Sequence, residues 1–195
     1  MRRGMRKKAG PCPRVPFRPS ALRRGAIPML VAAAVLLPRL ALAGMLAAGA
    51  PMPDFALPDQ HGNLVKSSDL AGKTYLLWFY PKAMTPGCTT EARGLRDEYR
   101  ELQAAGVTVL GVSFDGSDSN DKFATTESLP FPLLSDKDRK LAVAVGAADS
   151  ERSWFARRIS YLVGPDGKVV KAYDHVDPDT HAKQVLADVS PPGVH

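Results

Sequence analysis

Cysteine is scarce in this sequence, because only Cys12 and Cys88 occur among its 195 residues. A framework of several internal disulfides is therefore excluded. Histidine occurs only four times, and no spacing of histidine with cysteine is typical of a zinc site. No glycine-rich loop has the pattern of a nucleotide-binding site. The sequence thus offers neither a metal site nor a nucleotide site.

Acidic residues are missing from the beginning of the chain. No Asp or Glu precedes Asp54, whereas ten Lys and Arg residues do. The formal net charge of +6 therefore describes the N-terminal segment, since the rest has 16 Lys and Arg against 20 Asp and Glu, or −4. A mildly acidic body of this kind argues against a nucleic-acid partner.

A long hydrophobic run is also missing. The apolar stretch Ala26–Leu37 is too short to cross a bilayer, but it has the length of a signal-peptide core. It follows a basic segment and precedes Ala41-Leu42-Ala43, a typical cleavage pattern. We therefore expect residues 1–50 to be a leader and favour export to the periplasm or another extracytoplasmic compartment. Two alternatives stay open: translation that starts at Met45, which would give a cytoplasmic protein, and a membrane tether or organelle transit peptide.

The most informative stretch runs from residue 75 to residue 102. It begins with Tyr75–Tyr80, an aromatic-rich apolar run that predicts a buried strand. A helical pattern follows, in which residues on one face recur at intervals of four, three, four and three: Cys88, Ala92, Leu95, Tyr99 and Leu102. Thr85 suits the N-cap of this helix and Pro86 suits its first position. Cys88 is therefore expected in the first helical turn.

The beginning of a helix is a favourable place for a cysteine anion. Unpaired backbone N–H groups and the positive end of the helix dipole stabilise negative charge there. Helix N-termini and nearby Arg or Lys favour the thiolate over the thiol. Cys88 is thus a candidate nucleophile, although a buried cysteine that serves only as a small hydrophobic residue is the alternative interpretation.

The segment Tyr80–Glu91, with Pro, Thr and Cys at fixed offsets, closely resembles the active-site loop of the peroxiredoxin Q group, also called bacterioferritin comigratory proteins. The similarity runs from about Gly49 to Val189. This resemblance implies an α/β thioredoxin-like fold over residues 51–190, with a central mixed sheet flanked by helices. It also implies a thiol-dependent peroxidase of antioxidant defence that reduces hydrogen peroxide and organic hydroperoxides without a bound cofactor.

The resemblance assigns roles to residues near the cysteine. Cys88 is the expected peroxidatic nucleophile, which becomes a sulfenic acid. Thr85 is expected to hydrogen-bond the thiolate and the peroxide, whereas the competing interpretation makes its hydroxyl a helix cap. Pro81 is expected to shield the pocket, although it also suits the end of a strand.

A cation is expected beside the sulfur as well. The family carries an arginine just before a strand of the form Arg-Ile-Ser-Tyr-Leu, which is Arg158 here. Arg157 is adjacent, but neighbouring strand residues point to opposite faces, so the two can be told apart. Glu91 either orients Arg158 or is an ordinary acid favoured by the helix dipole.

The remaining chain predicts a thioredoxin-like order of elements. Strand, helix and strand from residue 75 to 113 form a parallel crossover. Gly164–Gly167 joins two later strand patterns into an antiparallel hairpin. The expected elements are a hairpin (54–59 and 64–66), a helical turn (67–72), strands (107–113, 158–163 and 168–173), a segment that returns to the sheet (130–134), and helices (121–127 after a polar loop at 115–120, 139–145 and 180–189).

The positions at which many relatives carry a second, resolving cysteine hold Arg93 and Ala142 here. Cys12 lies in the expected leader. We therefore expect a one-cysteine cycle, in which an external thiol (thioredoxin, glutaredoxin or glutathione) reduces the Cys88 sulfenic acid through a mixed disulfide. The resemblance favours a monomer.

Two other functions compete with this one. A thiol–disulfide oxidoreductase of the same fold needs two cysteines three residues apart, but position 85 is Thr. A non-enzymatic thioredoxin-like module with a structural cysteine is the other alternative.

Overall fold

The structure is a computed structural model that describes residue 10 and residues 44–189. The expected leader lies almost wholly outside the described residues, together with Cys12. The described part contains the strands β1 Ala56–Pro58, β2 Leu64–Lys66, β3 Thr74–Phe79, β4 Val107–Ser113, β5 Leu133–Ser135, β6 Ile159–Val163 and β7 Val169–Tyr173. Its helices are the 3-10 helix η1 Ser67–Leu70 and α1 Pro86–Asp97, α2 Tyr99–Ala104, α3 Ser117–Glu127, α4 Lys140–Ala144 and α5 His181–Val189.

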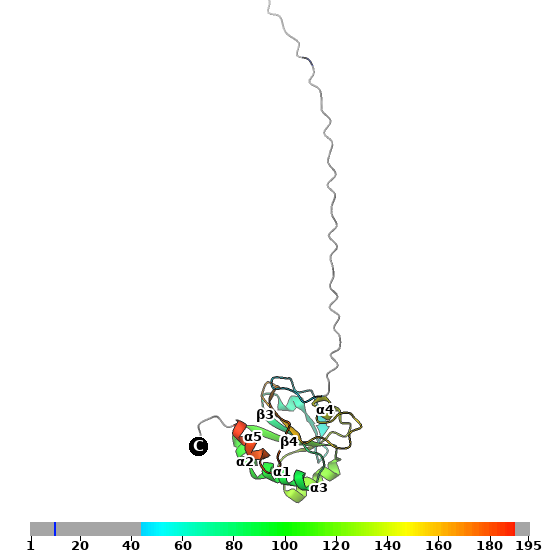
Figure 1. Ribbon diagram of the computed structural model, residues 1–195, viewed down its shortest axis with the longest axis vertical. Coiled ribbons are helices and arrows are strands. Elements are labelled where there is room, and N and C mark those ends of the chain that lie inside the picture. The colour runs from blue at the N-terminus through cyan, green and yellow to red at the C-terminus, as the bar shows by residue number, and fades with distance from the viewer. Residues whose placement is uncertain (1–9, 11–43, 190–195) are drawn as a thin grey trace, which may run out of the picture. The chain divides into compact units, whose positions relative to one another are not determined.

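Within residues 44–189 the central sheet has five strands in the order β5-β4-β3-β6-β7. Its two neighbouring strands β3 and β4 are labelled in Figure 1. β3 pairs in parallel with β4 and antiparallel with β6. β4 pairs in parallel with β5, and β6 pairs antiparallel with β7. The expected mixed sheet and the parallel crossover from β3 through α1 and α2 to β4 are therefore confirmed, as is the small antiparallel hairpin of β1 and β2.

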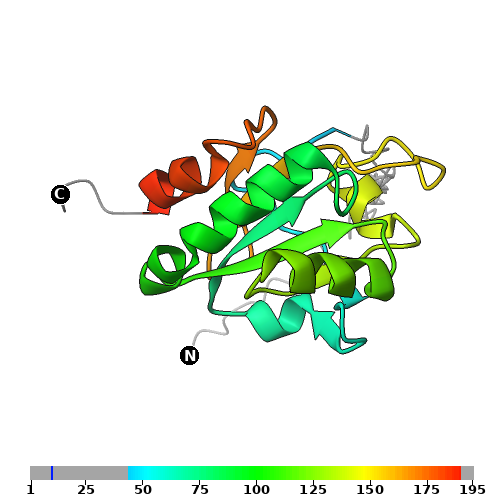
Figure 2. The ribbon, with the colours of Figure 1, turned by 90° about the horizontal axis from the view of Figure 1, so that it is seen from below.

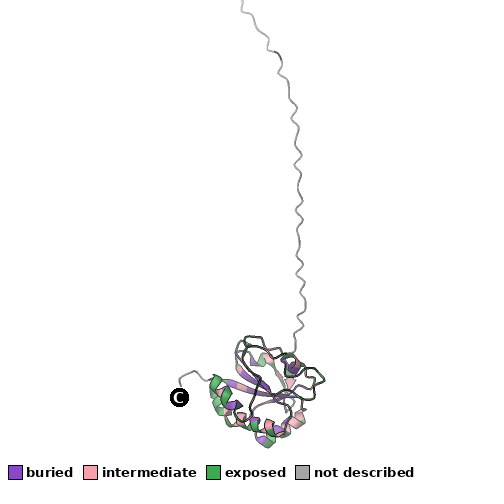
Figure 3. Cartoon of the chain, in the orientation of Figure 1, coloured by how far each residue is buried: buried purple, intermediate pink, exposed green. Residues whose placement is uncertain are grey.

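The two faces of the sheet are covered by different elements. Alternate residues of β3 point to opposite faces, so Leu76 and Trp78 join one core cluster and Tyr75 and Leu77 join the other. The first cluster is completed by α1, α2, α3 and α5, and the second by α4, η1 and the hairpin. Figure 2 shows α1 between α5 and α3 on the first face. Figure 3 shows buried residues concentrated in the sheet, whereas the helices carry buried, intermediate and exposed residues.

Two expected helices differ from the structure. The pattern from Cys88 to Leu102 predicted one helix, but the chain forms α1 and α2 with Glu98 between them at φ −94° and ψ 7°. Leu95 and Leu102 are buried on both sides of this break, so the hydrophobic face stays continuous. The prediction of a polar loop at 115–120 is largely wrong, because α3 begins at Ser117.

Residues that precede position 51 contact the central sheet. Leu46 N donates a hydrogen bond to the Tyr161 hydroxyl at 3.1 Å, and Gly49 N donates to the Val169 carbonyl at 2.7 Å. These contacts place residues 46–50, which the sequence analysis assigned to the leader, against β6 and β7. None of the helices in the described ranges has the length and apolar character needed to cross a membrane.

Candidate active site

Cys88 occupies the first turn of α1. Thr85 is the N-cap in extended conformation, and Pro86 is the first helical residue. Proline is favourable there because its missing N–H would have no helical partner. The Cys88 side chain is fully buried and forms no disulfide with any of the described residues. Cys88 is therefore a shielded residue of the first helical turn, as expected.

Arg158 is the cation that contacts this sulfur. Its Nη2 lies 3.3 Å from Cys88 Sγ. The register of the sheet explains this placement: Ser160 pairs with Trp78, whose side chain faces α1, and Arg158 lies two residues earlier on the same face as Ser160. Arg157 turns away and pairs with Asp149. The alternative of a one-residue misassignment is therefore excluded by the geometry.

Glu91 connects the helix to this arginine. Its side chain is fully buried, and its Oε2 accepts a hydrogen bond from Arg158 Nη1. Glu91 is outside the first turn of α1, so the interpretation as an ordinary first-turn acid is wrong. Burial raises the pKa of the Glu91 carboxyl to about 7, against the lowering effects of the Arg158 charge and the nearby Trp78 indole. Although burial opposes the charged form of Arg158, Glu91 and Cys88 raise the pKa of the guanidinium, which stays charged.

The Thr85 hydroxyl forms neither of the two expected hydrogen bonds, which were to the Cys88 thiolate and to the N–H groups at the beginning of α1. It donates a hydrogen bond to the Lys82 carbonyl at 2.9 Å, and no side-chain capping bond is made at this end of α1. The cap interpretation is therefore wrong, and the hydroxyl instead tightens the turn before the helix. Met84, next to it, has a positive φ of 65°, which is uncommon for a residue other than glycine.

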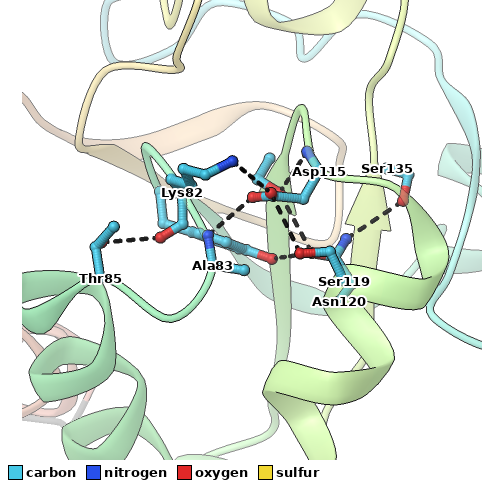
Figure 4. A network of polar contacts seen from close by, with 9 residues as sticks. Lys82, Ala83, Thr85, Asp115, Ser119, Asn120 and Ser135 are labelled. Atoms are coloured by element: carbon cyan, nitrogen blue, oxygen red, sulfur yellow. Dashed lines mark hydrogen bonds and ion pairs between the residues drawn. The ribbon is translucent and has the colours of Figure 1, made fainter.

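A polar network attaches this loop to the neighbouring strand (Figure 4). Asp115, just beyond β4, accepts a hydrogen bond from Ala83 N at 2.8 Å and lies 3.5 Å from Lys82 Nζ. Behind it, the Tyr80 hydroxyl donates to Asn120 Oδ1 at 2.8 Å. Asp115, between β4 and α3, thus holds the loop that precedes Cys88, and Asn120 in the first turn of α3 holds Tyr80 at the end of β3.

Pro81 lines a small hollow together with residues that include Lys82, Phe114 and Phe155. The structure thus brings Cys88, Glu91 and Arg158 together, with Thr85 at the cap position. No group of three or more His, Cys, Asp or Glu side chains able to hold a metal occurs within the described residues.

The buried side chains that lie next to the Glu91–Arg158 pair were not predicted from the sequence. They are Trp78, Ser160 and His181, all fully buried. His181 was not assigned a role from the sequence, because no spacing of the four histidines with cysteine is typical of a metal site. A signal was present, since His181 lies four residues before the buried Val185 and therefore on the inner face of α5.

Gly87 offers a way to move Arg158 without changing a charge. A Cβ at this position would lie 3.1 Å from Arg158 Nη2. For Gly87→Ala we expect the guanidinium to shift by a few tenths of an ångström and the rate of peroxide reduction to fall about tenfold. The free energy of unfolding should stay within about 1 kcal/mol of the parent, because alanine is a better helix former than glycine. Stopped-flow kinetics and urea unfolding measure both.

Gly94→Ala on the same helix is the matched control for this variant. Its added Cβ would meet Ala182 Cβ at 3.6 Å, an ordinary contact distant from the guanidinium. We expect unchanged kinetics in this control. Equal losses of rate in both variants would contradict the steric argument.

The arrangement brings together groups that can stabilise negative charge next to a cysteine sulfur. A helix N-terminus and an arginine act on one buried sulfur, and a buried carboxylate fixes the arginine. Such a site favours nucleophilic attack by sulfur and offers a donor for negative charge that develops on a leaving oxygen.

Comparison with known proteins agrees with this geometry. The model of the AhpC/TSA family matches residues 48–172. Peroxiredoxin Bcp of Escherichia coli strain K12 is 44% identical over 147 residues, which cover 72% of this chain and 94% of that protein.

Solved structures give the same result. The crystal structure of peroxidoxin BcpB from Mycobacterium tuberculosis is similar with a TM-score of 0.69 and 32% identity, covering 74% of this chain and 96% of that one. The bacterioferritin comigratory protein of Xanthomonas campestris, described for alkyl peroxide reduction, has a TM-score of 0.68 and 32% identity, covering 73% and 97%. The chain therefore belongs to the AhpC/TSA family, in its peroxiredoxin Q (Bcp) group, and is a thiol peroxidase with a thioredoxin-like fold.

Proposed function

We propose that Cys88 is the peroxidatic residue of this enzyme and that it works in a one-cysteine cycle on hydrogen peroxide and organic hydroperoxides. The observation that carries the proposal is the 3.3 Å contact between Arg158 Nη2 and the buried Cys88 sulfur at the beginning of α1. The alkyl peroxide reduction reported for the relative from Xanthomonas campestris supports the inclusion of organic substrates.

In the first step the Cys88 thiolate attacks one oxygen of the hydroperoxide. A sulfur–oxygen bond forms, the O–O bond breaks, and the leaving oxygen takes up a proton to become water or an alcohol. Arg158 stabilises the negative charge that develops on the departing oxygen. The Thr85 hydroxyl exchanges its bond to the Lys82 carbonyl for one to the peroxide, and Pro81, which has no N–H, limits access of water to the sulfur.

In the second step an external thiol returns two electrons. A first thiol attacks the Cys88 sulfenic acid and releases water, and a second thiol cleaves the resulting mixed disulfide. An internal disulfide between Cys88 and a second cysteine is disfavoured, because the two positions at which relatives carry that cysteine are not cysteines here. Position 93 is an exposed arginine, and position 142 is an alanine buried in α4. Thioredoxin, glutaredoxin and glutathione are the candidate reductants, and the enzyme is proposed to act as a monomer.

Mass spectrometry of the intact chain tests this cycle. After one equivalent of peroxide we expect one added oxygen on Cys88, trapped by a sulfenic-acid reagent, and no intramolecular disulfide. With each candidate reductant in turn, we expect a mixed disulfide on Cys88 followed by recovery of the thiol. A Cys12–Cys88 disulfide that forms at the rate of turnover would replace the one-cysteine cycle by a two-cysteine cycle.

For the segment before residue 44, export remains the proposal that its basic, apolar and small-residue pattern supports. N-terminal sequencing of the mature protein is the test. A mature terminus close to Gly44 after signal cleavage supports export, whereas translation starting at Met45 would mean a cytoplasmic enzyme.

A further inference from the structure

Buried polar side chains link α5 to the Glu91–Arg158 pair, and the proposed mechanism does not use them. His181 opens α5 and is fully buried. Its Nε2 lies 3.0 Å from Ser160 Oγ and 3.9 Å from Glu91 Oε1. The other oxygen of Glu91 accepts from Arg158, which contacts the sulfur. A continuous line of polar groups therefore runs from α5 to the nucleophile.

The position of the ring determines which way its dipole points. With its proton on Nε2, His181 directs an N–H toward the Ser160 oxygen and the Glu91 carboxylate. The opposite tautomer would direct a lone pair at the carboxylate and would bury an N–H at Nδ1, an atom with no hydrogen-bond partner in the described part of the chain. Burial and the Arg158 charge lower the pKa of His181 to about 4. The ring is therefore neutral at pH 7 and acts through its dipole.

We propose that His181 is a positioning residue of the peroxidatic site: its Nε2–H stabilises the negative charge of Glu91, and the charged Glu91 holds Arg158 against Cys88. The inference rests on the proposed role of Cys88. The distance of 3.9 Å is too long for a hydrogen bond, so the effect is that of a dipole near a charge. Burial strengthens this effect, because the side chains of both residues are fully buried. Glu91 Oε1 makes no hydrogen bond of normal geometry within residues 44–189, and the nearby Trp78 indole is another group that favours its charge.

The surroundings of the pair set the direction of the pH effect. The titratable and charged groups that face it come from four elements: Cys88 on α1, Arg158 before β6, Tyr173 on β7 with its ring centre 5.1 Å from that of His181, and Asp188 on α5. The pKa of Glu91 is already raised by burial. Loss of the N–H dipole raises it further, so Glu91 takes up a proton at higher pH and releases Arg158.

The test is the pH profile of Cys88 oxidation by hydrogen peroxide, measured in a single turnover with the full chain. We expect His181→Leu to move the midpoint of the acid limb upward by about one pH unit. His181→Gln should keep the parent midpoint, because the glutamine amide nitrogen reaches the place of Nε2. If the leucine variant does not fold, His181→Asn replaces it, since its shorter amide reaches only the place of Nδ1 and should also shift the midpoint.

Val185→Ala is the matched control, because it removes packing from the same face of α5 without touching Glu91. It should lower the melting temperature and leave the midpoint unchanged. An equal shift in the alanine control, or a shifted midpoint in a folded His181→Gln, would overturn the positioning role. Failure of the proposed function looks different: Cys88 would then stay unoxidised in the parent, and no profile would exist in any variant.

Discussion

Cys88→Ser is expected to reduce peroxide consumption to the uncatalysed background, a loss of at least roughly 10⁴-fold with any reductant. The physical reason is that a serine hydroxyl beside Arg158 is far less acidic than a thiol and cannot become the nucleophile at neutral pH. The buried hydroxyl should cost at most about 2 kcal/mol of stability, so the variant should fold. Peroxide consumption and urea unfolding, measured on the same preparation, separate the two effects.

Cys12→Ser is the control for this result, because it removes the other cysteine and leaves the site intact. We expect it to retain full activity with an external thiol. Activity that survives in Cys88→Ser would refute the proposed nucleophile. Activity that is lost in Cys12→Ser would instead mean that Cys12 resolves the sulfenic acid.

The strands of this fold were predictable because their signal is local. The apolar run at 75–80 is short and rich in aromatic residues, as in a buried strand, and the turn at 164–167 fixes the antiparallel pairing of the strands on either side of it. The beginning of α3 was not predictable in this way. Ser, Asp and Asn in its first turn have low helix propensity, and they are helical here because tertiary contacts hold Asn120.

The residues of the site likewise fall into those that a local sequence pattern predicts and those that depend on tertiary packing. Cys88 and Thr85 follow from the local pattern of a helix N-terminus, and the choice of Arg158 over Arg157 follows from resemblance and is then fixed by strand alternation. The Thr85 hydrogen bond and the place of His181 depend on how separate segments pack. Glu91 and His181 are far apart in the sequence, so no local pattern could predict that they lie close together.

Arg158→Met is expected to lower the rate of Cys88 oxidation by peroxide about 10²–10³-fold, the usual cost of removing one donor from a preorganised charge-stabilising site. Methionine keeps much of the side-chain length but provides neither charge nor donor. Arg158→Lys should recover only part of the rate, because one ammonium replaces the planar guanidinium that contacts both Glu91 and Cys88. Single-turnover kinetics at constant pH measure all three proteins.

Arg157→Met provides a matched control one residue away. Its guanidinium pairs with Asp149 at the surface, so we expect less than a twofold change in rate and about 1 kcal/mol or less in stability. An equal loss of rate in both arginine variants would contradict the assignment of Arg158.

The stability of Arg158→Met should depend on pH in a direction set by Glu91. The pKa of the Glu91 carboxyl in the folded protein is already above its unfolded value, because burial raises it. The Arg158 charge lowers this pKa, so removal of Arg158 raises the pKa further. A buried acid of this kind is more stable protonated, so it stabilises the fold less as the pH rises above the unfolded value of about 4.3. We therefore expect Arg158→Met to be destabilised more at pH 8 than at pH 5. Glu91→Gln in the same chain should remove that pH dependence without restoring the rate, because the amide cannot ionise and Cys88 still lacks its cation. Recovery of the rate in the double variant would show that Arg158 acts only by neutralising Glu91.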